Sequence, residues 1–188
     1  MAPATKALAI ALLSASASLI YCAQTMASDE VPAGIEELRA AMEKYKDPVV
    51  AVRDGYFSTL GCVAYESGTM GVHFINPALI SPEPDPLKPV LLVYEPQGEK
   101  LELVAVEWLI PLATGIKSKP SLFGHPFDGP MEGHEPLLPA ALHHYDLHAW
   151  IFKDNPKGMF SPVNPDVNCP QGPYSFVEEP PKSVPNPN

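Results

Sequence analysis

The first apolar pattern along the chain has the spacing of an amphipathic helix. Between residues 34 and 46, apolar side chains recur every three or four positions and charged side chains fill the other face. Asp47-Pro48 has the form of a helix N-cap followed by proline at the first helical position, and Gly55 has the form of a stop. We therefore expect a surface helix over 34–46 and a second, short helix after it. The apolar residues that define the first helix are Ile35, Leu38, Met42 and Tyr45.

After residue 55 the pattern changes to runs of branched and aromatic residues, each bounded by Gly, Pro, Asn or Asp. Pro96-Gln97-Gly98 suits a hairpin connection, which would make the strands on either side of it antiparallel neighbours. We expect an α+β fold in which an N-terminal helix, or a bent helix pair, packs on a mostly antiparallel sheet that could curl into a small barrel. The predicted strands cover residues 56–65, 71–76, 90–95, 100–110 and 144–152.

The two ends of the chain differ in composition from the part between them. Residues 1–27 combine Lys6, an apolar run and small residues at the end, which is the layout of a cleaved export signal. The apolar run is too short, and too rich in Ser and Ala, for a good membrane span. Cys22 could carry a lipid anchor, although bulky residues precede it. Residues 170–188 are rich in proline and predict a flexible tail. We expect a single domain over 28–169, exported to the periplasm or outside the cell.

Charge and proline content narrow the expected partners. The chain has 12 basic and 22 acidic residues, a net charge of −10, and loss of the signal would remove only Lys6 from these. The negative field would repel nucleic acid and an anionic membrane face, so we expect a small molecule or a metal ion as partner. The 24 prolines predict many loops. Two of these loops, 77–89 and 111–139, are long enough to be functional. No pattern fixes an oligomeric state.

Two cysteines, Cys62 and Cys169, remain after the expected signal. In an oxidising compartment, an isolated pair favours a disulfide. Such a bond would close a loop of about 100 residues and stabilise the fold by roughly 4 kcal/mol through the entropy of the unfolded chain. Ligation of a metal by thiolates and a catalytic cysteine are the alternatives.

Glu107 lies in a run, 101–110, that is apolar on both faces when it forms a strand. Simple alternation would put Leu103 on the face of Glu107 and Trp108 on the opposite face. A strand covered on both sides leaves a carboxylate few ways to reach water, so Glu107 would be protonated, paired with a cation or bound to a metal. The alternative is a side chain that reaches solvent at the end of the strand.

Two histidines lie on other predicted strands. His73 is in a short apolar strand and His148 is in the last one, and either could offer an imidazole nitrogen to a metal or act as a base. A core histidine hydrogen-bonded to a backbone carbonyl is the plainer alternative. Two histidines and one carboxylate are the usual open ligand set of catalytic zinc and of non-haem iron, and imidazole also suits copper. We therefore expect a divalent transition metal, namely zinc, copper or iron, at His73, Glu107 and His148.

Residues 142–152 contain three of the six histidines. In a helix, His144 and His148 would lie one turn apart and could bind one ion together. In a strand, His144, Asp146 and His148 share a face, but the outer two are about 13 Å apart. The aromatic content favours the strand, so we expect this segment to contribute His148 while His144 lies at the rim of the site. Second-choice ligands are His125, His144 and Asp146.

His125 and His134 lie on the long loop, where they could close over a pocket or add a ligand, but loop histidines are more often solvated. Motifs of several other chemistries are missing from the sequence. It contains no Gly-x-Ser-x-Gly elbow, phosphate-binding Gly-rich loop, dinucleotide fingerprint or His-Glu-x-x-His pair.

The segments GTMGVHFINPALI, LVAVEW, SLFGHPF and YDLHAWIFKDNPKGMFSPVNPDVNC resemble a family of exported bacterial proteins that has no established activity. The resemblance covers roughly residues 56–169 and implies export and a single domain. His73, Glu107, His148 and Cys169 lie inside the matching segments.

The patterns together favour an exported metal-binding protein with a His/His/Glu site in a sheet core, which could be a metal-dependent enzyme or a carrier. Two alternatives stay open. One is an exported module that holds a small non-metal ligand and has structural histidines. The other is a structural or interaction protein of the cell envelope.

Overall fold

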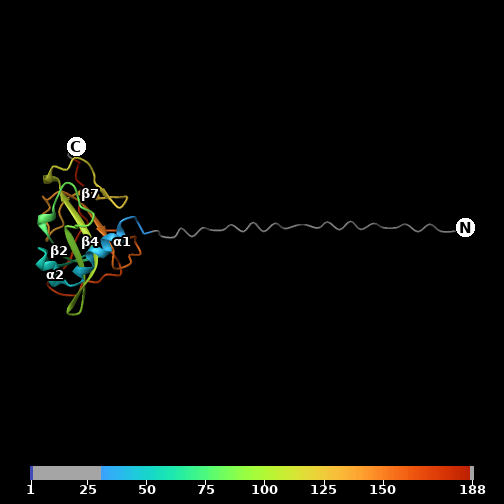
Figure 1. Ribbon diagram of the computed structural model, residues 1–188, viewed down its shortest axis with the longest axis horizontal. Helices are drawn as coiled ribbons and strands as arrows, with labels where there is room; N and C mark the ends of the chain where they lie inside the picture. Colours follow the sequence, from blue (N-terminus) through green and yellow to red (C-terminus); the bar gives the residue numbers. More distant parts are fainter. Residues whose placement is uncertain (2–30, 187–188) are drawn as a thin grey trace. The chain divides into compact units, whose positions relative to one another are not determined.

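A computed structural model describes residue 1 and residues 31–186. Apart from residue 1, the expected signal peptide, 1–27, and Cys22 within it therefore lie outside the described residues. From Val31 onward the chain forms one compact unit, in which short helices pack on a curled sheet (Figure 1). The expected α+β class is confirmed. Among the described residues, no helix is both long and apolar enough to cross a membrane.

The N-terminal helical segment follows its apolar spacing closely. The side chain of Asp47 accepts a hydrogen bond from the Val49 amide at 2.9 Å, as expected of an N-cap before proline. The segment predicted as one helix is an α-helix that tightens into a 3-10 turn before this cap. The elements are α1 (Ile35–Met42), η1 (Glu43–Lys46) and α2 (Pro48–Arg53).

The main sheet has seven strands in the order β7-β8-β4-β3-β2-β1-β9. Neighbours are antiparallel except for β1 and β9, which are parallel. The predicted hairpin joins β3 to β4. The strands are β1 (Phe57–Tyr65), β2 (Gly68–Ile75), β3 (Leu91–Gln97), β4 (Lys100–Pro111), β7 (Asp128–Met131), β8 (His144–Ala149) and β9 (Ser175–Val177), with a separate pair β5 (Ser121–Leu122) and β6 (His125–Pro126) and 3-10 turns η2 (Pro77–Leu79) and η3 (Leu112–Thr114).

The sheet is covered on both faces by different parts of the chain. On one face, α1 packs Ile35 and Leu38 into the main hydrophobic cluster with Trp108 of β4 and Leu147 of β8. On the other face, Leu109 of β4 packs in a smaller cluster with loop residues that include Leu138 and Leu142. The helix-covered face is therefore the main core, and the other face is free to hold polar side chains between apolar patches.

A β-bulge changes the predicted alternation of β4. Val93 of β3 pairs with Ala105, but the next residue, Tyr94, pairs with Leu103, so Val104 is extra. Leu103 consequently packs in the helix-covered core. The expectation that Leu103 shares a face with Glu107 is wrong, because simple alternation cannot anticipate one inserted residue.

The C-terminal segment, for which the composition predicts a flexible tail, packs against the domain in its described part, up to residue 186. β9 pairs with β1, Glu178 is buried, and the Val184 amide donates to the Pro130 carbonyl at 3.0 Å. The predicted disulfide between Cys62 and Cys169 is present, with a Cα separation of 5.6 Å, and it fixes the start of this segment beside β1. The edge of β1 offers backbone N–H and C=O groups with which the proline-rich segment can pair. Composition alone does not reveal such partners.

Candidate metal centre

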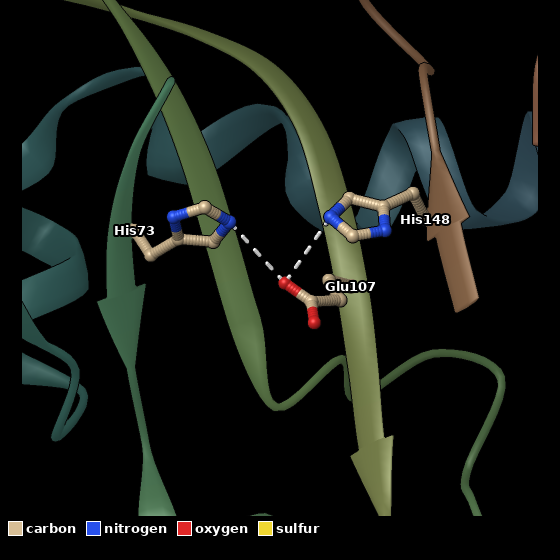
Figure 2. Close-up of side chains that lie close together, drawn as sticks. All are labelled: His73, Glu107 and His148. Carbon is tan, nitrogen blue, oxygen red and sulfur yellow. Dashed lines mark ion pairs between the residues drawn. The ribbon is translucent and has the colours of Figure 1, made fainter. Parts of the chain in front are cut away.

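Three strands place His73, Glu107 and His148 together on the sheet face away from the helices. Glu107 of β4 is the direct cross-strand neighbour of His148 on β8. His73 of β2 pairs with Val93 of β3, one strand further along. The curl of the sheet allows His73 to reach across β3, and Figure 2 shows the two imidazole rings on either side of the carboxylate. All three residues predicted as ligands are thus brought to one place.

The alternation of each strand explains this orientation. On β8, Leu147 and Ala149 point into the helix-covered core, so His148 between them points the opposite way. On β4, Trp108 points into the same core, so the adjacent Glu107 points the opposite way. Glu107 is only 5% exposed and His148 only 1%. The alternative that Glu107 reaches solvent is therefore wrong.

The distances in this first group, His73, Glu107 and His148, suit a shared ion. Oε2 of Glu107 lies 3.4 Å from Nε2 of His73 and 3.4 Å from Nε2 of His148. A tetrahedral ion with bonds of about 2.0–2.1 Å separates its ligand atoms by about 3.3–3.4 Å. One ligand atom from each residue also lies within 4.8 Å of the other two. The residues present therefore fit a metal ion without rearrangement of the strands.

His148 stands out among the buried polar side chains of the described residues, because two of its atoms lack a hydrogen-bond partner. Both of its ring nitrogens are buried, and neither has a hydrogen bond within the described structure. An unsatisfied buried donor or acceptor costs about 1–3 kcal/mol, and most buried side-chain polar atoms in proteins are satisfied. A cation bound at Nε2 would satisfy one of the two nitrogens.

The electrostatics of the group favour an ionised carboxylate. Burial alone would raise the pKa of Glu107, but the adjacent His148 and His73 outweigh burial and lower the pKa below its ordinary value. The carboxylate therefore keeps its negative charge at neutral pH inside the protein. A buried anion flanked by two imidazoles is a favourable environment for a divalent cation.

The second-choice residues fall in a different group. His144 and Asp146 of β8 meet His134 from the loop after β7, and one ligand atom from each lies within 4.8 Å of the others. His144 is fully buried and so does not lie at the rim. His125 is not in either group, and it stacks on Phe160 with ring centroids 4.6 Å apart.

The second group consists of His134, His144 and Asp146. Burial and the Asp146 carboxylate change the pKa values of its histidines. Burial lowers the pKa of His134. Burial would lower the pKa of His144 as well, but the adjacent Asp146 outweighs it and raises that pKa. Burial raises the pKa of Glu178, which lies near His134 and Tyr65.

A cavity of about 390 Å³ connects the two groups. Its wall is mainly apolar, with side chains such as Met70, Leu109 and Leu138. Its polar lining residues are Thr59, His73, Glu107, His134, His144 and Glu178. Phe57, which also lines it, is 55% exposed, so the cavity reaches the surface. A small molecule could therefore enter and contact an ion held by the first group.

Comparison with known proteins gives no match: no family model fits the chain, and no curated protein or solved structure is significantly similar to it. The geometry of the two groups is therefore the basis for inference about function.

Tyr65 and Glu178 of the site region were not singled out by the sequence patterns, and His134 was only one of two loop histidines that could add a ligand. His134 lies on a loop, where histidines are commonly solvated, and Tyr65 and Glu178 have no motif around them. Tyr65 donates to Oε2 of Glu178 at 3.0 Å, and its oxygen is 2.7 Å from Nδ1 of His134. The Gly133-His134-Glu135 sequence carries no signal of burial, because the covering chain segments come from distant parts of the sequence.

Proposed function

We propose that this protein binds a divalent transition metal ion, namely zinc, copper or iron, through His73, Glu107 and His148. The observation that supports this most directly is the carboxylate oxygen of Glu107, which lies 3.4 Å from one nitrogen of each histidine in a buried position. Two imidazoles and one carboxylate are a ligand set that zinc and iron use in open sites. The group thus has the right atoms, spacing and burial for one ion.

Three protein ligands leave a coordination position for water or substrate. The adjoining apolar cavity is the direction from which a small molecule would arrive. A metal-dependent enzyme acting on a small, largely apolar substrate is therefore one form of the proposal, and a metal carrier is the other. In either form the role of His73 and His148 is to hold the ion, and Glu107 neutralises part of its charge.

We propose further that the protein works in an oxidising compartment, in the periplasm or outside the cell. The disulfide between Cys62 and Cys169 supports this, because such bonds are rare in reducing compartments. The export signal expected from residues 1–27 points the same way.

Elemental analysis of protein purified without a histidine tag tests the metal proposal. We expect Glu107→Gln and His148→Ala each to lower the bound metal by about one equivalent. Glu102→Gln is the matched control, since Glu102 lies on the same strand with its side chain exposed. Less than about a tenth of an equivalent of any transition metal, with no uptake on titration, contradicts the proposal.

The cavity itself favours a second candidate, a module that binds a small apolar ligand while the histidines are structural. Its wall is mainly apolar, as is usual for small-molecule sites. An apolar fluorescent probe that binds metal-stripped protein and metal-loaded protein equally would support this alternative. Competition between the probe and the ion, or binding only in the presence of the ion, would favour the metal site.

A further inference from the structure

The second group of histidine and acid side chains carries an inference of its own. Nε2 of His144 lies 3.8 Å from Oδ2 of Asp146, and Nε2 of His134 lies 3.9 Å from the same oxygen. The rings of the two histidines are 5.2 Å apart between centroids. Two imidazole nitrogens therefore approach one carboxylate oxygen at separations longer than a hydrogen bond.

Hydrogen bonds on the far side of each ring decide which nitrogen carries a proton. Nδ1 of His144 lies 3.1 Å from the Leu142 carbonyl, which can only accept, so this nitrogen donates. When Tyr65 gives its single hydrogen to Glu178, its oxygen accepts from Nδ1 of His134. In the neutral form of both rings, Nε2 therefore presents a lone pair toward Asp146.

Three acceptor atoms thus converge with no donor between them. Nε2 of His134 and Nε2 of His144 are buried and have no hydrogen-bond partner in the described structure, and the same is true of Oδ1, the other oxygen of the Asp146 carboxylate. Such an arrangement is repulsive unless a cation lies among the atoms. An extra proton on a ring would draw nitrogen and oxygen to about 2.7–2.9 Å, which is well below the observed separations.

We propose that His134, His144 and Asp146 form a second metal site, which takes a divalent cation of the zinc type. Separations of 3.8 and 3.9 Å are too long for hydrogen bonds but can be spanned by two metal–ligand bonds. Both histidines also have the outer support that metal-bound imidazoles nearly always have, with the second ring nitrogen held by an oxygen. Tyr65, in turn, is held by Glu178.

The second ion is separate from the first. Asp146 and His148 lie two residues apart on β8 and face the same side, which places their backbone positions about 7 Å apart. Two ions that share a bridging ligand are only about 3.5–4 Å apart. The two groups share no residue, so each ion has its own ligands, and removal of one set leaves the other set intact.

Metal-stripped protein without a histidine tag, titrated with Zn²⁺ against a chromophoric chelator, tests the second site. We expect two equivalents for the unchanged protein, and one for each of Asp146→Asn, His134→Gln and Glu107→Gln. The double variant Glu107→Gln with Asp146→Asn should bind none. His143→Ala is the matched control, because this exposed histidine is the direct neighbour of His144 and should leave two equivalents bound.

The outcomes separate the two sites. One equivalent in the unchanged protein, retained in Asp146→Asn and in His134→Gln, overturns the second site and leaves the first standing. One equivalent that is lost in those two variants but retained in Glu107→Gln supports the second site and contradicts the first. Absorption bands of bound Co²⁺ that change in both Asp146→Asn and His134→Gln would support direct ligation. A variant that loses the ion because it misfolds would also lose circular dichroism. This control applies to His134→Gln on the loop and to Asp146→Asn on the strand.

Discussion

At the scale of single residues, the central feature is how few hydrogen bonds the buried histidines and acids make with each other. Oε2 of Glu107 is 3.4 Å from two imidazole nitrogens, and Oδ2 of Asp146 is 3.8–3.9 Å from two more. Cores normally satisfy such atoms directly, because an orphaned polar atom is costly. Spacing that is longer than the roughly 2.7–2.9 Å of a charge-assisted hydrogen bond, repeated in two groups, is what bound ions would produce.

Tyr65 offers a prediction that tests the outer support of the second site. Tyr65→Phe removes the oxygen that holds Nδ1 of His134 and leaves the ring in place. Loss of such a partner commonly lowers metal affinity by about 10–100-fold, so we expect that change at the second site and none at the first. Competition titration with Zn²⁺ measures it. Tyr174→Phe is the control, since Tyr174 is 64% exposed. An equal loss of affinity at both sites would contradict the prediction.

At the scale of elements, the sequence predicts which residues of the first group come together but not the whole candidate site. Alternation along β4 and β8 correctly gives Glu107 and His148 a common face, and the hairpin signal correctly pairs β3 with β4. His134 could not be found in this way, because its burial depends on distant segments folding over a loop. The bulge at Val104 was equally invisible, since one extra residue leaves the composition of the run unchanged.

β2 has a backbone position that only glycine fits, and His73 depends on it. Gly71 has φ of 124°, and a Cβ there would lie 2.7 Å from the carbonyl oxygen of Tyr94. We expect Gly71→Ala to lower the free energy of unfolding by about 2–4 kcal/mol and to weaken metal binding through displacement of His73. Denaturant unfolding and Zn²⁺ titration measure the two effects.

The hairpin glycine between β3 and β4 is the matched control for that substitution. Gly98 has φ of 63°, and no atom lies within 4 Å of a Cβ built there. Gly98→Ala should therefore cost only about 1 kcal/mol, from backbone strain alone, and leave metal binding unchanged. Equal destabilisation by the two substitutions would show that the close approach to Tyr94 is not important.

At the scale of the whole molecule, the two candidate metal-binding groups depend on different parts of the chain. The first group comes from three central strands, β2, β4 and β8, which pack on the helix-covered core. The second group needs the loop at His134 and the C-terminal segment that brings Glu178 to Tyr65. β9 is a short parallel edge strand, and beyond it the segment is held by backbone hydrogen bonds of Glu178, Lys182 and Val184.

The disulfide is what we expect to hold that segment in place. Cys62 and Cys169 are 107 residues apart in sequence, and a loop of about 100 residues corresponds to roughly 4–5 kcal/mol of stabilisation through the unfolded chain. Next to the bond, the Cys62 amide donates to the Tyr174 carbonyl at 2.8 Å, which leads the chain into β9 and on to Glu178. Replacement of both cysteines by alanine should therefore act on stability and on the second site together.

We expect the double variant Cys62→Ala with Cys169→Ala to unfold at a lower denaturant concentration, with roughly 4 kcal/mol less free energy of unfolding. In the variant that is still folded, affinity for Zn²⁺ should fall at the second site and stay unchanged at the first, because only the second relies on Glu178 and Tyr65. Unfolding curves measure the change in stability, and competition titrations without denaturant measure the change in affinity. Treating the unchanged protein with a metal-free reductant should reproduce them, whereas an equal loss at both sites would mean that the disulfide supports the whole sheet rather than the C-terminal segment.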